Sequence, residues 1–267
     1  AALEKAHELM PESNRIFFEL TQLYKGLNLS LEERLALYKN EEKTVFTRDD
    51  CTLQYSVLST IAGDIDKAFG ILADHRFHTY EGGEGYLTQH HAWLHFITGR
   101  KLLEEKKYAE AEEMLISGLT FPTGYGEEKN YFVNDAPIYL ELAEVYGAQG
   151  LEEKRDEYLR LALTTHGAPT VHSYYECLAF KALGMDGEAK KLADEMEKIG
   201  KNKIETAEIP EYYGVGSPAY QPFNYDIAKV HSLAGYLMCG FAALAKGDKK
   251  AAVEYAEKAE KIDCADF

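Results

Sequence analysis

A glycine-rich segment at residues 76–86, RFHTYEGGEGY, groups the side chains with the clearest potential for chemistry. Its glycines permit backbone geometries that are closed to other residues, so the two carboxylates of the segment can approach each other. Paired carboxylates can act as acid and base, accept hydrogen bonds from a sugar or bind a cation. The alternative is a solvated turn whose charges cap a helix. The candidate binding residues of this segment are His78, Tyr80, Glu81 and Glu84.

Histidines are concentrated in and just after this segment. His91 and His95 are four residues apart, a spacing that would place two metal ligands on one face of a helix. No HExxH motif accompanies them, and no carboxylate stands at a diagnostic interval. We therefore expect histidines that pack or line a groove, and we predict no metal site and no cofactor.

Two aromatic segments, at residues 121–135 and 209–226, share the pattern Pro-x-x-Tyr-Gly and end in an aspartate suited to cap the following helix. Aromatic loops of this kind can stack on flat ligands or anchor a partner protein. They can equally fold back and fill a groove, because a buried tyrosine gains both packing and a hydrogen bond. The candidate binding residues here are Tyr125, Tyr212 and Tyr213.

Signatures of common enzymes are missing from the sequence. It contains no GxSxG nucleophile elbow, no Walker loop and no glycine fingerprint of a dinucleotide-binding strand. We therefore predict that the chain is not an enzyme by itself.

The elements that must position these loops are helices in a repeating arrangement. The clearest unit is LLEEKKYAEAEEMLISGLTFP at residues 102–122, where Tyr108, Ala111 and Leu115 form the inner face of a helix that Pro122 ends. This pattern resembles the second half of a tetratricopeptide repeat. Similar units surround the turn glycines Gly63, Gly150, Gly184 and Gly247. About six helical hairpins are predicted, which makes the chain an all-α, right-handed superhelical solenoid.

We expect residues 1–267 to form a single solenoid domain. Ala6 and Pro11 fall where a second helix would end, so residues 1–11 are expected to close a preceding repeat, and the natural protein to continue upstream. The other predicted parts are the first hairpins at 12–75, central repeats at 76–200 with long loops at 76–86 and 121–135, an aromatic loop at 201–226 and a last hairpin at 227–267.

A solenoid presents first-helix side chains on its concave face. The side chains expected on that face are Tyr139, Tyr146, His172, Tyr175 and His231.

The composition of the chain limits the classes of partner that we expect. The chain has 29 basic and 45 acidic residues and a net charge of −16, which argues against nucleic acid and an anionic membrane surface as partners. No run of about 18 apolar residues was found, so no membrane span is predicted. The four cysteines share no metal-type spacing and suit a reducing compartment, so a cytoplasmic location is expected.

The phrase FHTYEGGEG at residues 77–85 resembles Phe-His-x-Trp-Glu-Gly-Gly-Glu-Gly, found in the C-terminal repeat region of a group of large bacterial proteins. Tyr80 stands where that phrase has tryptophan. Pro210, Glu211, Gly214 and Gly216 match a second phrase of the group, Tyr-Pro-Glu-Asn-Leu-Gly-x-Gly, and the resemblance covers about residues 60–262. It implies an upstream β-rich domain of carbohydrate-related activity, on which this chain would dock.

Two functions follow from these patterns. The first is a scaffold that binds a protein, a peptide or the upstream domain. The second is a carbohydrate-associated module to which the Glu, His and Tyr residues of the loops contribute a sugar site. If the glycine-rich and aromatic loops converge on one enclosed pocket, the sugar site is favoured; if they scatter over the outside, the scaffold is favoured.

Overall fold

The computed structural model describes residues 2–78, 83–129, 133–164, 168–207 and 226–265. These parts of the chain are helical and contain no β-strand, which confirms the all-α prediction. The helices are α1 (Ala2–Leu9), α2 (Asn14–Gly26), α3 (Leu31–Asn40), α4 (Glu42–Val45), α5 (Asp49–Ile61), α6 (Ile65–Asp74), α7 (Tyr86–Glu104), α8 (Tyr108–Ser117), η1 (Thr123–Tyr125), α9 (Ala136–Ala148), α10 (Glu152–Leu161), α11 (Ser173–Ala182), α12 (Asp186–Glu205), α13 (Ile227–Lys246) and α14 (Lys249–Glu260).

Local signals in the sequence set the ends of these helices. Ser30 forms a capping box with Glu33 at the start of α3, and the Asp226 side chain accepts a hydrogen bond from the Lys229 amide at the start of α13. The turn glycines predicted from the repeats have left-handed backbones, with φ of 80° at Gly63 and 83° at Gly247. Glycine adopts this conformation without steric penalty, so these positions end one helix and begin the next.

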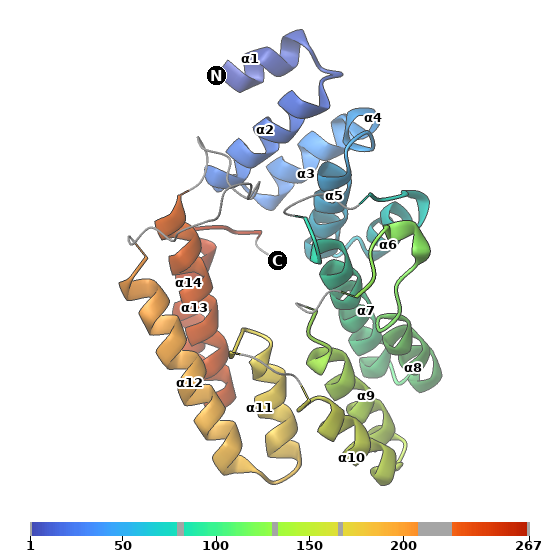
Figure 1. The fold of residues 1–267 in the computed structure, drawn as a ribbon, viewed down its shortest axis with the longest axis vertical. Coiled ribbons are helices and arrows are strands. Elements are labelled where there is room, and N and C mark those ends of the chain that lie inside the picture. Colours follow the sequence, from blue (N-terminus) through green and yellow to red (C-terminus); the bar gives the residue numbers. More distant parts are fainter. Residues whose placement is uncertain (1, 79–82, 130–132, 165–167, 208–225, 266–267) are drawn as a thin grey trace.

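Successive helices from α5 onward pack in pairs: α5 with α6, α7 with α8, α9 with α10, α11 with α12, and α13 with α14 (Figure 1). Helices α12 and α13 also pack closely, although they belong to neighbouring pairs. A Cβ atom at Gly235 would lie 2.7 Å from the Gly200 carbonyl oxygen, so only glycine allows this approach of the two backbones.

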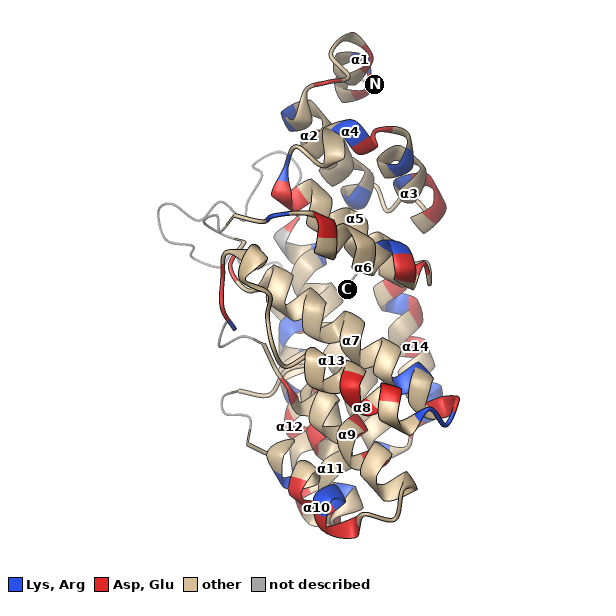
Figure 2. Ribbon diagram, turned by 90° about the vertical axis from the view of Figure 1, so that its right-hand side faces the viewer, with Lys and Arg blue, Asp and Glu red and all other residues tan. Residues whose placement is uncertain are grey.

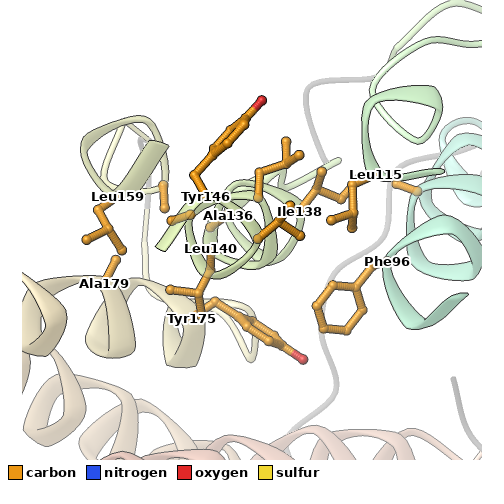
Figure 3. Close-up of a cluster of buried hydrophobic side chains, with 14 of the residues drawn as sticks. Phe96, Leu115, Ala136, Ile138, Leu140, Tyr146, Leu159, Tyr175 and Ala179 are labelled. Carbon is orange, nitrogen blue, oxygen red and sulfur yellow. The ribbon is translucent and has the colours of Figure 1, made fainter. Parts of the chain in front are cut away.

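The buried side chains form several clusters along the chain. The one centred on α9 contains Leu115, Ala136 and Leu159, each with no exposed surface (Figure 3). It extends from Phe96 on α7 to Tyr175 on α11, so each helix of this region is held by its neighbours in the sequence.

The chain curves so that its C-terminal helices come back beside its N-terminal ones (Figure 1). The Arg34 guanidinium donates to the Asp263 carboxylate at 2.9 Å, 229 positions away in the sequence. The Cys264 amide donates to the Asn28 side-chain oxygen at 2.7 Å, and the Asn28 amide group donates to the Glu260 carbonyl at 3.0 Å. We call these five residues the closing contact. The sequence analysis did not predict it.

Helix α13 is apolar throughout most of its length. Within the described chain, residues Ala228–Lys246 are the one stretch that could cross a membrane by length and composition alone, a feature that core helices of soluble proteins share. Helices α11, α12 and α14 pack on it here. Acidic and basic residues are interspersed along the other helices (Figure 2).

Candidate functional site

The start of the glycine-rich segment is held against the beginning of α5. The His75 ring donates to the Asp49 carboxylate at 2.6 Å, and the His78 amide and ring donate to the same group at 2.9 and 3.2 Å. Burial opposes ionisation of Asp49, but these hydrogen bonds prevail and lower its pKa. The ring of His78 and the side chain of Glu84 are exposed, while Tyr80 and Glu81 lie outside the described residues.

The glycine-rich segment also meets the first aromatic segment. The Phe77 amide donates to the Gly124 carbonyl at 3.0 Å, and the Gly85 amide donates to the Glu127 carboxylate at 3.1 Å. The Phe77 ring packs edge-on against the Tyr125 ring, with centroids 5.9 Å apart. We call the described residues of 75–86 and 121–127 the loop junction. Two of the three predicted loops therefore converge, and the third, with Tyr212 and Tyr213, lies outside the described residues.

His91 and His95 are buried beneath the loop junction. The Ser117 carbonyl can only accept, so His91 donates to it from Nε2 at 3.1 Å and accepts from the Tyr125 hydroxyl at Nδ1, at 2.8 Å. His95 donates to the His91 carbonyl at 2.8 Å. Burial lowers the pKa of His91, and it lowers that of His95 to about 4. Both rings are thus neutral packing groups at neutral pH, and no three His, Cys, Asp or Glu residues in the described chain are placed to hold a metal ion.

Tyr139 and Tyr146, which were expected on the concave face, pack against α10, and Tyr146 also contacts α8. The Tyr146 hydroxyl donates to Glu112 on α8 at 2.8 Å, and its ring packs on Tyr158 of α10. Tyr139 also packs on Tyr158. Helix α9 is apolar on both of its main faces, so periodicity alone could not show which face turns toward α10. His231 is buried and is not among the cavity-lining residues described next.

A cavity of about 420 Å³ lies in the middle of the curved chain. Its wall combines one side of each of several helices that are far apart in the sequence. The lining residues are Ile61 from α5; Gln89, Ala92, Trp93 and Phe96 from α7; Val133, Asn134, Pro137 and Ile138 at α9; Val171, His172 and Tyr175 at α11; Leu233, Leu237 and Phe241 from α13; and Ala256, Ala259, Glu260, Asp263 and Cys264 at the end of the chain. Most of these side chains are apolar, and Glu260, Asp263 and Cys264 also belong to the closing contact.

One side of the cavity is an aromatic wall formed by Trp93, Phe96, His172 and Tyr175. The Trp93 ring lies 4.8 Å from Phe96 and 6.2 Å from His172, and the Phe96 ring meets Tyr175 edge-on at 5.3 Å. Burial lowers the pKa of His172, so this ring is neutral at neutral pH. The wall can therefore bind apolar groups, or cations that lie over the faces of its aromatic rings.

A buried carboxylate, Glu141, lies near Tyr175 of the aromatic wall but is not among the cavity-lining residues. Glu141 lies one helical turn beyond Pro137, a lining residue, and its side chain is 9% exposed. Arg100, one turn beyond Phe96, places its Nε atom 3.8 Å from the Glu141 carboxylate, which is too long for a hydrogen bond. Burial raises the pKa of Glu141 to about 7, and Arg100 only partly opposes this shift.

Sequence reasoning missed Glu141 and most of the lining. A signal was present, since Glu141 occurs in the apolar stretch APIYLELAEVYGA of α9 at a position that shares a face with Pro137 and Ile138. His172 and Tyr175 were expected on the concave face, and both line the cavity.

Comparison with known proteins assigns neither a family nor a function. No protein-family model matches the sequence. Among solved structures, the chain is similar to the crystal structure of BtubC (BKLC) from P. vanneervenii, with 15% sequence identity over 90% of this chain and 89% of that chain and a TM-score of 0.34. Similarity at this level carries no information on fold or function.

Proposed function

We propose that this chain is a tetratricopeptide-like binding module that holds an apolar segment of a partner polypeptide in its central cavity. The observation that carries the proposal is the apolar cavity of about 420 Å³. Its volume falls within the range of about 300–1,000 Å³ that is typical of ligand pockets.

The order of the helices supports the repeat character. Helices α7, α9, α11 and α13 are each the first member of a pair, and each contributes to the cavity wall. In superhelical repeat proteins the first helices face the concave, ligand-binding side. We accordingly interpret the curved chain as a right-handed superhelix that acts as a scaffold in the bacterial cytoplasm.

The lining indicates what kind of contact the partner makes. Protein interfaces gain most of their affinity from a few large side chains that enter desolvated pockets. A cavity with an aromatic wall fits such an anchor, flanked by chain that runs along the inner helices. The resemblance seen in the sequence makes an upstream domain of the same protein one candidate source of this segment, and a separate protein the other.

A sugar site has less support. Sugars require many hydrogen-bonding groups, whereas few of the lining residues are polar. His78 and Glu84, the described candidates from the glycine-rich segment, do not line the cavity. Binding of an oligosaccharide is therefore the outcome that would overturn the proposal.

The experiment measures the intrinsic tryptophan fluorescence of the protein. Trp93 is the chain's only tryptophan and lines the cavity, so its fluorescence reports on cavity occupancy. Peptides would first be selected from a random display library on the purified chain. The selected peptides, and maltohexaose and cellohexaose as sugar probes, would then be titrated into the protein while Trp93 fluorescence is recorded.

Matched variants make the test specific. Ala256 is a small, exposed lining residue of α14, so Ala256→Phe should fill part of the cavity without disturbing the core. We expect it to weaken peptide binding at least about tenfold. Val253→Phe, on the same helix but outside the lining, should leave binding unchanged. Equal binding by both variants, or binding of the sugars alone, would contradict the proposal.

A further inference from the structure

The last residue of α14 and the segment after it belong to two structures at once. Glu260, Asp263 and Cys264 line the cavity. The same three residues form the closing contact with Asn28, just before α3, and Arg34, within α3, neither of which lines the cavity. One end of the cavity wall is therefore held in place by residues outside the cavity.

The closing contact joins the two sides of the curved chain. Helices α12–α14 form one side and α5–α8 the other (Figure 1). Within the described residues, α13 and α14 pack closely on each other, on α11 and on α12, and no comparable packing joins them to α1–α8. Ile61 and Trp93 line the cavity from one side, and Leu237 and Phe241 line it from the other. The separation of these walls thus depends on the closing contact and on the longer path through α9 and α11.

The closing contact is less firmly built than the core of a helix pair. Its apolar anchors at the C-terminal end are Ala265 and Cys264, two small side chains in a cluster with residues of α2 and α3. Asn28 has a left-handed backbone with φ of 53°, which is uncommon for residues other than glycine. Oδ2 of Asp263 is buried without a hydrogen bond and has the Lys25 ammonium beside it at 3.4 Å. The contact can therefore open while the helix pairs stay folded.

A ligand that touches both sides of the cavity depends on this contact. When the two sides are apart, the ligand keeps its contacts with one wall and loses those with the other, so it binds the closed form more tightly. The effect is reciprocal, because closure raises the affinity for the ligand by the same factor by which the bound ligand favours closure.

We propose that occupancy of the cavity and formation of the closing contact are coupled, so that residues 260–265 act as a clasp that closes on the bound segment. This inference rests on the proposed function, because it requires the cavity to bind a ligand, and it adds how that ligand is retained.

The test changes the closing contact without altering the cavity lining. Asn28→Gly removes both side-chain hydrogen bonds to the C-terminal segment, while glycine adopts the left-handed backbone of this position without strain. Trp93 fluorescence would be titrated with 1-decanol, an uncharged probe with a long alkyl chain. We expect Asn28→Gly to weaken binding of 1-decanol at least about fivefold. Asn40→Ala, at an exposed asparagine that ends α3, should leave binding unchanged.

Hydrogen exchange tests the same coupling in the unaltered protein. The Ala265 amide donates to the Asp263 carboxylate at 3.0 Å, and Ala265 is not a lining residue, so its exchange reports on the clasp and not on direct contact with the probe. This exchange should slow at least about fivefold when 1-decanol is saturating. At the same probe concentration, Ala256→Phe should reduce the protection together with binding, because it fills part of the cavity.

The outcomes separate this inference from the proposed function. If 1-decanol binds the unaltered protein but leaves Ala265 exchange unchanged, or binds Asn28→Gly equally well, the cavity remains a binding site and the clasp is wrong. If Asn28→Gly binds the probe more tightly, the closing contact hinders binding, and the clasp is again wrong. If 1-decanol does not bind the unaltered protein, the cavity accepts no apolar ligand and both proposals fail. The exchange measurement remains decisive even if Asn28→Gly does not fold.

Discussion

The closing contact and the aromatic wall each place an arginine beside a buried carboxylate, with opposite results. Arg34 and Asp263 lie 2.9 Å apart, and their side chains are 3% and 4% exposed. Arg100 and Glu141 lie 3.8 Å apart, and the arginine is 55% exposed. Since desolvation must be offset by close pairing, we call the first pair completed, although Oδ2 of Asp263 has only the Lys25 ammonium beside it at 3.4 Å, and the second pair incomplete, because it is too long for a hydrogen bond. A completed pair holds structure together, whereas the incomplete pair leaves Glu141 with a raised pKa.

Breaking the completed pair should have the largest effect. Arg34→Met leaves the buried Asp263 carboxylate with the Ala265 amide at 3.0 Å and with the Lys25 ammonium, whose Nζ atom is 3.4 Å away on a side chain that is 43% exposed. We expect the free energy of unfolding to fall by about 3 to 5 kcal/mol in urea denaturation, because removing one partner leaves a buried charge poorly compensated. Hydrogen exchange should also accelerate in α14.

The control for this variant is Arg15→Met. Arg15 pairs with Glu19 on the surface, and its side chain is 81% exposed, so we expect no measurable change. Similar losses in the two variants would show that burial of the closing contact contributes nothing to stability.

Removing the incomplete carboxylate should stabilise the protein, in a pH-dependent way. The pKa of Glu141 is raised from an ordinary value of 4.5 to about 7 in the fold, so the native state binds more protons than the unfolded chain between these values. The stability of the unaltered protein therefore falls as pH rises through this window. Glu141→Gln, which stays neutral, should be more stable by up to about 3 kcal/mol above pH 7 and about equal at pH 4.

Urea unfolding at several pH values would measure this difference. Glu144→Gln is the matched control, because that neighbouring residue is exposed and should show no such pH dependence. A loss of stability in Glu141→Gln at pH 8 would mean that Arg100 already pairs effectively with the carboxylate, which would erase the contrast between the two regions.

The smallest effect is expected at the loop junction, where the hydrogen bond between Tyr125 and His91 joins two neutral groups, unlike the charged pair of the closing contact. Tyr125→Phe removes the hydroxyl that donates to Nδ1 of the buried His91 at 2.8 Å. We expect a loss of about 1 kcal/mol in thermal or urea unfolding, since an unsatisfied buried acceptor is left behind. Tyr86→Phe, at a residue that is 58% exposed, should change nothing. A Tyr125→Phe protein of unaltered stability would rule out this hydrogen bond as a support of the junction.

The helices and their turns were accessible from sequence because local chemistry determines them. Gly150 and Gly184 were placed at turns on pattern alone, and both have the left-handed backbone that favours glycine. Ser30, a residue type that favours helix N-termini, caps α3 together with Glu33. These features depend on residues within one or two helical turns, so a single sequence contains the information.

The cavity and the closing contact were not accessible in the same way. Asp263 and Arg34 are 229 positions apart, and nothing in either neighbourhood indicates the other. Glu141 looked like an ordinary polar position because its burial depends on how α7, α9 and α11 converge. The candidates His91 and Tyr125 were selected for their residue types, yet the two side chains hydrogen-bond to each other at the base of the loop junction. Long-range packing decides which polar groups find hydrogen-bond partners, and the periodicity of the sequence carries no information about that packing.

The closing contact has a consequence for the order of folding. Bringing Arg34 to Asp263 requires the intervening chain to be organised first, because closing so long a loop in a disordered chain carries a large entropic penalty. The local helix pairs should thus assemble early, and the two ends should meet last. Interrupted synthesis or C-terminal proteolysis would then leave an assembled but unsealed molecule, with its apolar interior open to solvent and prone to aggregate.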